Sequence, residues 1–154
     1  MIRLYHGGVP GLRIGDHIRP GHSRDDRHPG CAICEARAAG APTPIDPASV
    51  RQDRVYVTED REYARYHASL YGRGDLYQVA TVGDVERSGE DEFPSYVCER
   101  AEVVAVYARA VILTWQQRRS LYRRWSALEG MHPRDADREF GRMVAGLTAR
   151  AASA

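Results

Sequence analysis

The sequence predicts an α+β fold. Short runs rich in β-branched and aromatic residues recur through the region 1–113, whereas apolar residues take a helical spacing from residue 114 onward. One more helix is predicted early, directly after a strand at 54–58. We therefore expect one β-rich domain over 1–113, with a C-terminal extension of two helices over 114–154 packed on it.

The composition excludes several classes of protein. The length of 154 residues fits a single domain with its own core. A formal net charge of +1 gives no molecule-wide field for nucleic acid or a membrane surface. The sequence shows neither the pattern of a signal peptide nor a run of the ~20 apolar residues that span a bilayer. Its three cysteines, an odd number without secretory features, predict a reducing, cytoplasmic location.

The chain opens with a short apolar strand that ends in His6, Gly7 and Gly8. The glycines lack a Cβ, so a ligand could approach the backbone closely there. A turn and a short irregular strand or loop are predicted over 9–18. Residues 21–53 are rich in proline, glycine and alanine and predict a long surface insertion.

The predicted strand 54–58 leads into a helix over 59–71. Thr58 is a suitable N-cap, and acidic residues in the first turn complement the helix dipole. Gly72 and Gly74 are expected to end the helix. One face of this helix carries Tyr63, Tyr66, His67 and Leu70 at helical spacing.

Further strands are predicted over 76–81, 96–98, 102–107 and 110–113, with an acidic loop over 83–92. The helix at 115–128 then combines apolar and aromatic residues with four arginines. Those arginines could meet the phosphates of a nucleic acid, but a solvated helix face is the favoured interpretation. A last helix is predicted to begin near residue 133.

The insertion contains a candidate zinc site. His22, His28, Cys31 and Cys34 follow the spacing His-x₅-His-x₂-Cys-x₂-Cys. Thiolate and imidazole groups suit tetrahedral zinc, and a metal would order a segment that has little core of its own. The alternative is a pair of thiols with no ligand role, because strong zinc sites usually join two separated half-sites. We expect any zinc here to be structural.

Three features could form a ligand site. His6 stands at a strand end, where it either hydrogen-bonds a ligand or simply finishes an edge strand. Tyr56 either packs in the core or offers its ring to a flat ligand. The acidic loop 86–92 is either an ordinary wet loop or the source of a carboxylate that stabilises positive charge at a glycosidic carbon.

Taken together, these features resemble the ADP-ribosyltransferase fold, in the His–Tyr–acid branch that includes the poly-ADP-ribose polymerases. The chain is most similar to the rifampicin ADP-ribosyltransferases. The resemblance covers residues 4–107 in order and spacing. It is carried by Tyr5-His6-Gly7, by Leu12 to Asp16 through Pro20-Gly21, by Val55-Tyr56-Val57-Thr58 before a helix, by Gly72 to Tyr77, by Ser95-Tyr96 before Val103-Val104, and by a late acidic position.

The resemblance implies a split, mostly antiparallel pair of sheets with a cleft for NAD⁺, the donor substrate, between them. His6 would hydrogen-bond the adenosine-proximal ribose, and the backbone of Gly7 would hold the nicotinamide carboxamide. Tyr56 would stack on the nicotinamide ring, with Tyr66 or His67 closing the other side. Nicotinamide would leave through an oxocarbenium-like state that an acceptor then attacks.

The chain departs from the family at the acid. Matching to the rifampicin enzymes puts the aspartate position near Ser88, and matching to the polymerases puts the glutamate position on Ser95. Carboxylates lie on both sides of Ser88. Asp91 is the preferred candidate for the acid, with Glu90 and Glu86 behind it.

The resemblance thus implies an NAD-dependent glycosyltransferase that moves ADP-ribose to an acceptor hydroxyl or other nucleophile, with a small molecule favoured over nucleic acid. One alternative is a non-catalytic module on the same fold that binds NAD⁺ or a nucleotide, or docks a partner through helix 115–128. The other is an RNA 2′-phosphotransferase-like enzyme. The lack of a second histidine at the position of Tyr56 counts against the latter.

Overall fold

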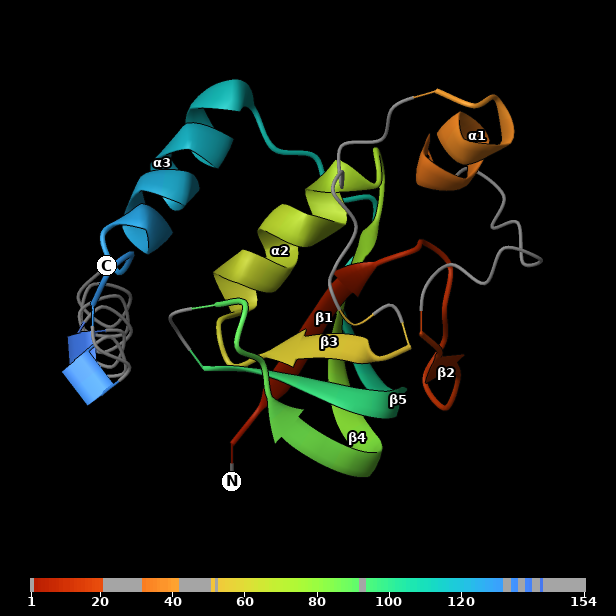
Figure 1. Ribbon diagram of the computed structural model, residues 1–154. Coiled ribbons are helices and arrows are strands. Elements are labelled where there is room, and N and C mark those ends of the chain that lie inside the picture. The colour runs from red at the N-terminus through yellow and green to blue at the C-terminus, as the bar shows by residue number, and fades with distance from the viewer. Residues whose placement is uncertain are drawn as a thin grey trace.

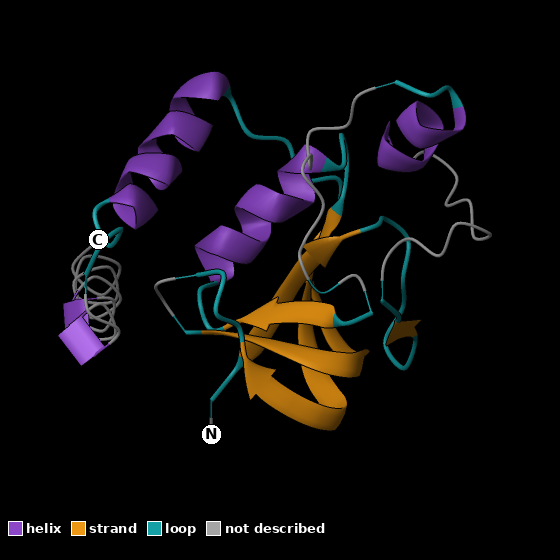
Figure 2. Ribbon diagram, viewed as in Figure 1, coloured by secondary structure: helices purple, strands orange, loops and turns teal. Residues whose placement is uncertain are grey.

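The computed structural model describes residues 2–20, 32–41, 51, 53–91, 94–131, 134–135, 138–139 and 142. It confirms the α+β class (Figures 1 and 2). The five strands are β1 (Leu4–Gly8), β2 (His17–Ile18), β3 (Val55–Thr58), β4 (Asp75–Arg87) and β5 (Ser95–Ala108). The three helices are α1 (Ala32–Ala38), α2 (Arg61–Leu70) and α3 (Trp115–Ser126).

The strands form one antiparallel sheet in the order β2-β5-β3-β1-β4, and β4 pairs with β5 as well. The sheet therefore closes on itself, where the resemblance implies two separate sheets. This closure depends on the length of β4 and β5, which contain 13 and 14 residues and carry several register shifts. The main core lies among these strands and includes Val57, Tyr77, Cys98 and Val103.

Two predicted boundaries and one predicted strand are wrong. β4 continues to Arg87, so half of the predicted acidic loop is strand, and the predicted strands 96–98 and 102–107 are one continuous strand, β5. The segment 110–113 has the alternating burial of a strand, with Val111 and Leu113 buried and Ile112 exposed, but it forms no strand. Its apolar side chains instead join the cluster between β1 and α2.

Helix α2 packs on β1 at very short range. A Cβ on Gly7 would lie 1.7 Å from the carbonyl oxygen of Ala64 and 2.6 Å from the amide nitrogen of Ala68. Both alanines are buried. Gly7 therefore lacks a side chain because the helix occupies that space, which is a different use of this glycine from the close ligand approach that the sequence suggests.

Asp60, and not Thr58 as predicted, caps the N-terminus of α2. Oδ1 of Asp60 accepts hydrogen bonds from the amides of Glu62 at 2.9 Å and Tyr63 at 3.3 Å. Thr58 acts one step earlier, because its Oγ1 accepts from the amide of Asp60 at 3.0 Å and donates to the carbonyl of Pro94 at 3.2 Å. At the other end Gly72 takes φ 83°, as expected for a residue that ends a helix.

The same aspartate ties α3 to α2, which lie alongside each other in Figure 1. Oδ2 of Asp60 accepts from Nε1 of Trp125 at 3.1 Å and pairs with Arg124 at 3.3 Å. The Trp125 ring packs edge-on against Tyr63 and Tyr66, with centroids 4.8 and 5.2 Å apart. Helix α3 is therefore held against α2 by an aromatic cluster and one buried carboxylate, whereas Trp115 and Tyr122, which we expected to pack as well, are exposed.

Asp60→Ala is expected to lower the free energy of unfolding by about 2–3 kcal/mol, since it removes a helix cap and leaves the indole N–H of Trp125 buried without its acceptor. Asp60→Ser keeps a capping oxygen but cannot reach the indole, so it should recover about 1 kcal/mol of this loss. Urea unfolding followed by tryptophan fluorescence measures both. Equal stability of the alanine variant and the parent would contradict the proposed role of Asp60 in holding α3 on α2.

The predicted insertion contains a helix, α1, where only irregular structure was predicted. Cys34 on α1 is half-buried and packs against Val9. The other predicted zinc ligands, His22, His28 and Cys31, lie outside the described residues, as does most of the last predicted helix. Within the described ranges no group of three or more potential metal ligands occurs, and no helix has the length and apolar character to cross a membrane.

Candidate functional site

His6 lies on β1 near the point where β1 meets β3, with Tyr5 opposite Thr58. The Nδ1 atom of His6 is 2.8 Å from the carbonyl oxygen of Tyr56, so a side-chain hydrogen bond joins the two strands. Because a carbonyl only accepts, Nδ1 carries the proton. Burial lowers the pKa of His6 below its ordinary value of 6.5, although the hydrogen bond to Tyr56 opposes this. His6 is thus neutral at physiological pH, with a lone pair on Nε2 that can accept a hydrogen bond.

Gly8 leaves the space that the His6 imidazole occupies. Residues 6 and 8 share one side of the strand, and a Cβ on Gly8 would lie 2.5 Å from Nε2 of His6. Any side chain at this position would therefore push the ring away from Tyr56. The His-Gly-Gly sequence has a separate structural reason for each glycine: Gly7 admits helix α2, and Gly8 admits the histidine ring.

Tyr56 projects from β3 toward the acidic loop. Its hydroxyl donates a short hydrogen bond to Oε1 of Glu90 and accepts one from the amide of Arg51 at 2.9 Å. Burial, with a smaller contribution from Glu90, raises the pKa of Tyr56 to about 12. The phenol therefore stays protonated at all physiological pH values and serves as a hydrogen-bond donor that orients the carboxylate.

Asp91 is held by two hydroxyl groups from different elements. Oδ1 accepts from the Tyr63 hydroxyl of α2 at 2.8 Å, and Oδ2 accepts from the Ser95 hydroxyl at the start of β5 at 2.6 Å. Burial and the charge of Asp91 both raise the pKa of Tyr63, so this phenol also remains a donor. The carboxylate thus has a fixed position between α2 and β5.

His67, on α2, lies next to Tyr63, the residue that binds Asp91. Its ring lies edge-on to Tyr63, with centroids 4.6 Å apart. Burial lowers the pKa of His67 to about 4; the charge of Asp91 opposes the shift and the neighbouring His6 adds to it. The Tyr63 side chain thus contacts both His67 and Asp91, and His6 and His67 are both neutral at physiological pH.

Ser88 and Ser95 mark the two places at which the resemblance implies an acid, and each is hydrogen-bonded to a residue of the acidic loop. Ser88 Oγ accepts a hydrogen bond from the amide of Glu90 at 3.2 Å, and Ser95 Oγ donates to Asp91. Both serines are buried, and the amide of Ser88 is bonded to the carbonyl of Ser95 at 2.9 Å. On the loop that connects β4 to β5, the Asp91 carboxylate is therefore one hydrogen bond from Ser95, and the backbone of Glu90 is one hydrogen bond from Ser88.

The remaining predicted site residues lie elsewhere. Glu86 pairs with Arg51 at 3.5 Å and with Arg54 at 3.9 Å, on the exposed part of β4. Tyr66 packs against Trp125 in the contact between α2 and α3. Of the two α2 rings that were predicted to close the site, His67 is therefore the one grouped with His6 and Asp91, whereas Tyr66 belongs to the contact with α3.

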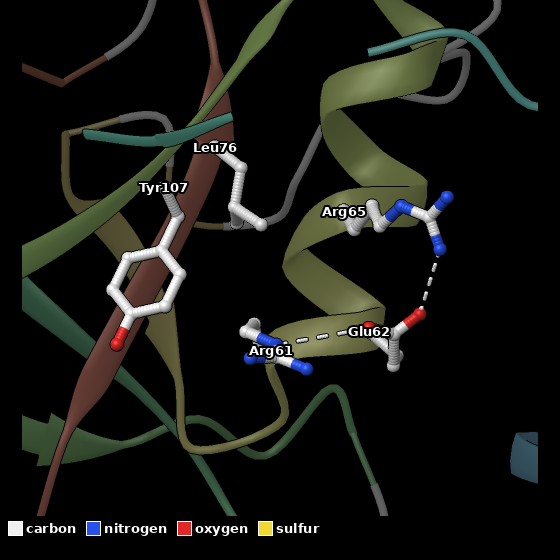
Figure 3. Close-up of a pocket in the computed structure, with 5 residues that line it drawn as sticks. All are labelled: Arg61, Glu62, Arg65, Leu76 and Tyr107. Carbon is white, nitrogen blue, oxygen red and sulfur yellow. Dashed lines mark hydrogen bonds and ion pairs between the residues drawn. The ribbon is translucent and has the colours of Figure 1, made fainter. Parts of the chain in front are cut away.

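A surface hollow of about 270 Å³ lies on another side of α2. Arg61, Glu62 and Arg65 line it from the helix, and Leu76 and Tyr107 line it from the sheet (Figure 3). At 100° per residue, Arg61 and Arg65 point roughly opposite to Tyr63 and His67. Both arginines pair with the single carboxylate of Glu62, at 3.7 and 3.1 Å, and this hollow is distinct from the candidate site.

Tyr63 and Ser95 hold the Asp91 carboxylate, although neither was predicted as a site residue. The spacing of Tyr63, Tyr66 and His67 on one helix face is visible in the sequence, but which ring meets the acidic loop depends on how α2 is rotated against β1.

No protein-family model matches this chain, and no curated protein sequence matches it.

Proposed function

We propose that the protein is an NAD-dependent ADP-ribosyltransferase that moves ADP-ribose to an acceptor nucleophile, with a small-molecule hydroxyl as the favoured acceptor. The observation that carries the proposal is the convergence of three separate segments. His6 of β1 bonds to the backbone of Tyr56 of β3, and Tyr56 bonds to the acidic loop at Glu90. These are the three positions on which the resemblance depends.

The side chains suit NAD⁺ chemically. The lone pair on Nε2 of the neutral His6 would accept a hydrogen bond from a ribose hydroxyl, while its Nδ1–H stays on the Tyr56 carbonyl. The rings of Tyr56 and His67 would flank the nicotinamide. As the bond between nicotinamide and C1 of the ribose breaks, the bond electrons leave with nicotinamide and positive charge develops on the sugar. A fixed carboxylate nearby would stabilise that charge, and the acceptor oxygen would then bond to C1 and release its proton to water.

Asp91 is the carboxylate that we assign to the transition state. It accepts from the Tyr63 hydroxyl, whose ring packs on His67, and two hydroxyl donors fix its position without neutralising its charge. Preorganised charge of this kind is what electrostatic catalysis requires. Glu90 is assigned a positioning role, because it holds the Tyr56 hydroxyl from an exposed site.

Nicotinamide release from NAD⁺ tests the proposal, with and without candidate acceptors. Asp91→Asn is expected to reduce release on the order of 100-fold, because the amide keeps the shape but loses the charge. Glu90→Gln should reduce it about tenfold or less. Glu86→Gln is the matched control and should leave the rate unchanged. If the parent protein releases no nicotinamide while NAD⁺ still raises its melting temperature, the non-catalytic binding module is correct instead.

Gly8→Ala is expected to lower the rate of release on the order of tenfold, because the added Cβ would lie 2.5 Å from Nε2 of His6 and displace the ring. Gly89→Ala is the control, since a Cβ there meets nothing within 4 Å. Melting temperatures of both variants show whether the effect is local. Full activity in Gly8→Ala would mean that the imidazole position is unimportant.

A further inference from the structure

The outer face of α3 exposes aromatic rings beside arginines. Trp115 is 69% exposed and Tyr122 is 56% exposed, both unusual for such large side chains. Arg119 and Arg123, also exposed, follow at helical spacing on the same face. The opposite face of the helix packs on α2 through Leu121 and Trp125, so the exposed rings contribute nothing to that contact.

The arginines of α3 divide into two groups. Arg118 donates to the carbonyl of Ser69 at 2.9 Å, and Arg124 pairs with Asp60, so these two point inward and hold the helix on the body. Arg119 and Arg123 belong to the outer face. The helix contains no acidic residue, and its first turn in particular carries none. A surface of positive charge thus exists on a molecule whose net charge is only +1.

The rings and guanidinium groups are arranged for stacking. The guanidinium of Arg119 lies over the Trp115 ring, 5.1 Å from its centroid. Trp115 and Tyr122 are seven positions apart, which places them roughly 10 Å from each other along the helix at the usual rise per residue. Along this face the order is ring, guanidinium, ring, guanidinium, which matches the alternation of bases and phosphates along a single strand.

We propose that the outer face of α3, formed by Trp115, Arg119, Tyr122 and Arg123, binds single-stranded nucleic acid. The bases stack on Trp115 and Tyr122, and the phosphates meet Arg119 and Arg123. The positive charge alone would also suit a duplex or an anionic lipid surface, but only an unpaired strand presents free base faces to the two rings. This surface is independent of the proposed ADP-ribosyl transfer.

Fluorescence anisotropy of a labelled oligothymidylate of about 12 nucleotides tests the proposal on the full chain. Trp115→Ala and Tyr122→Ala are each expected to weaken binding on the order of tenfold, and Arg119→Gln to do so while reducing the salt dependence. Arg100→Ala removes an exposed arginine from β5 and should leave the affinity unchanged. All four changes are at exposed positions, and circular dichroism confirms that each variant is folded.

Tryptophan fluorescence gives a second readout, because the chain has only two tryptophans and Trp125 is buried. The oligonucleotide should quench Trp115 in the parent. In Trp115→Phe, which keeps a ring for stacking, binding should persist within about threefold while the quenching disappears. Three results would overturn the proposal: no binding, equal affinity in Trp115→Ala and the parent, or tighter binding of duplex DNA or of phosphatidylserine vesicles than of the single strand.

Discussion

His6→Ala is expected to reduce nicotinamide release from NAD⁺ by a factor of about 100 or more. The change removes the Nε2 acceptor for the ribose and also the hydrogen bond between Nδ1 and the Tyr56 carbonyl. His6→Asn separates the two effects, because its amide can still donate to Tyr56 but has no counterpart of Nε2. We expect His6→Asn to be as stable as the parent and as inactive as His6→Ala. Full activity in the asparagine variant would exclude the assigned role of Nε2.

The pH dependence of release follows from the same geometry. Burial lowers the pKa of His6, so Nε2 is unprotonated and able to accept a hydrogen bond down to pH values below 6.5. When the pH falls through this lowered pKa, Nε2 gains a proton and becomes a donor. Release should therefore decline only on the acid side of pH 6.5, and a rate profile in a mixed buffer measures the decline. A loss of activity centred above pH 6.5 would contradict a buried, neutral His6.

The parts of the fold that were predicted correctly are those with a strong local pattern. The strand at Val55–Thr58 and the helix that follows it combine β-branched residues, an acidic first turn and terminal glycines within a few positions. The C-terminal half of β4 lacks such a pattern, since Gly83 and Asp84 suggest a turn. It is a strand because it pairs with β5, a contact between segments that the local sequence does not specify.

In the segment 110–113 the local pattern predicts a strand, but no strand forms. Val111 and Leu113 alternate with Ile112 in the period of a strand, and the burial follows that period. No strand forms because Ala110 takes φ 49°, and its amide and that of Val111 bond to Asp75 and Gly74. A period of two indicates which side chains are buried, but a partner strand is also required.

The sequence indicates the strand residues of the candidate site but not which loop carboxylate joins them. His6 and Tyr56 stand on short strands whose ends are fixed by local pattern, so their importance is visible in the sequence. The carboxylate is on a loop, and its identity depends on contacts that the fold alone determines: Tyr63 from α2 and Ser95 from β5. Nothing in the spacing of Glu86, Glu90 and Asp91 distinguishes them, whereas their hydrogen-bond partners do.

Asp75→Ala is expected to lower the free energy of unfolding by about 3 kcal/mol. Asp75 is only 2% exposed, and its carboxylate binds four donors, of which all but Tyr77 come from distant parts of the chain. The amide of Gly11 and the Tyr77 hydroxyl bond to Oδ2 at 2.8 and 3.2 Å. Arg109 reaches the same oxygen at 2.6 Å, and the amide of Ala110 bonds to Oδ1 at 2.8 Å.

The loss is large because the donors cannot all be satisfied by other groups. The amides of Gly11 and Ala110 belong to loops that join at Asp75, and removing the carboxylate leaves both near a cavity without an acceptor. The side chain of Arg109 is half-exposed, so water replaces part of its interaction. Asp75→Asn should recover less than half of the loss, because its amide nitrogen would face donors in place of Oδ2.

The stabilisation by Asp75 should also depend on pH. Burial alone would raise the pKa of Asp75, but the hydrogen bonds from Gly11, Arg109, Ala110 and Tyr77 together lower it below 3.8. A lowered pKa in the folded state means that the contribution is complete above pH 3.8 and is lost as the pH falls through the folded-state value. Urea unfolding across this range should therefore show the parent and Asp75→Asn converging in stability at low pH.

Asp84→Asn, at an exposed position, is the control and should differ from the parent by less than about 0.5 kcal/mol throughout. A difference between the parent and Asp75→Asn that does not change with pH would show that the ionised carboxylate is not the stabilising form.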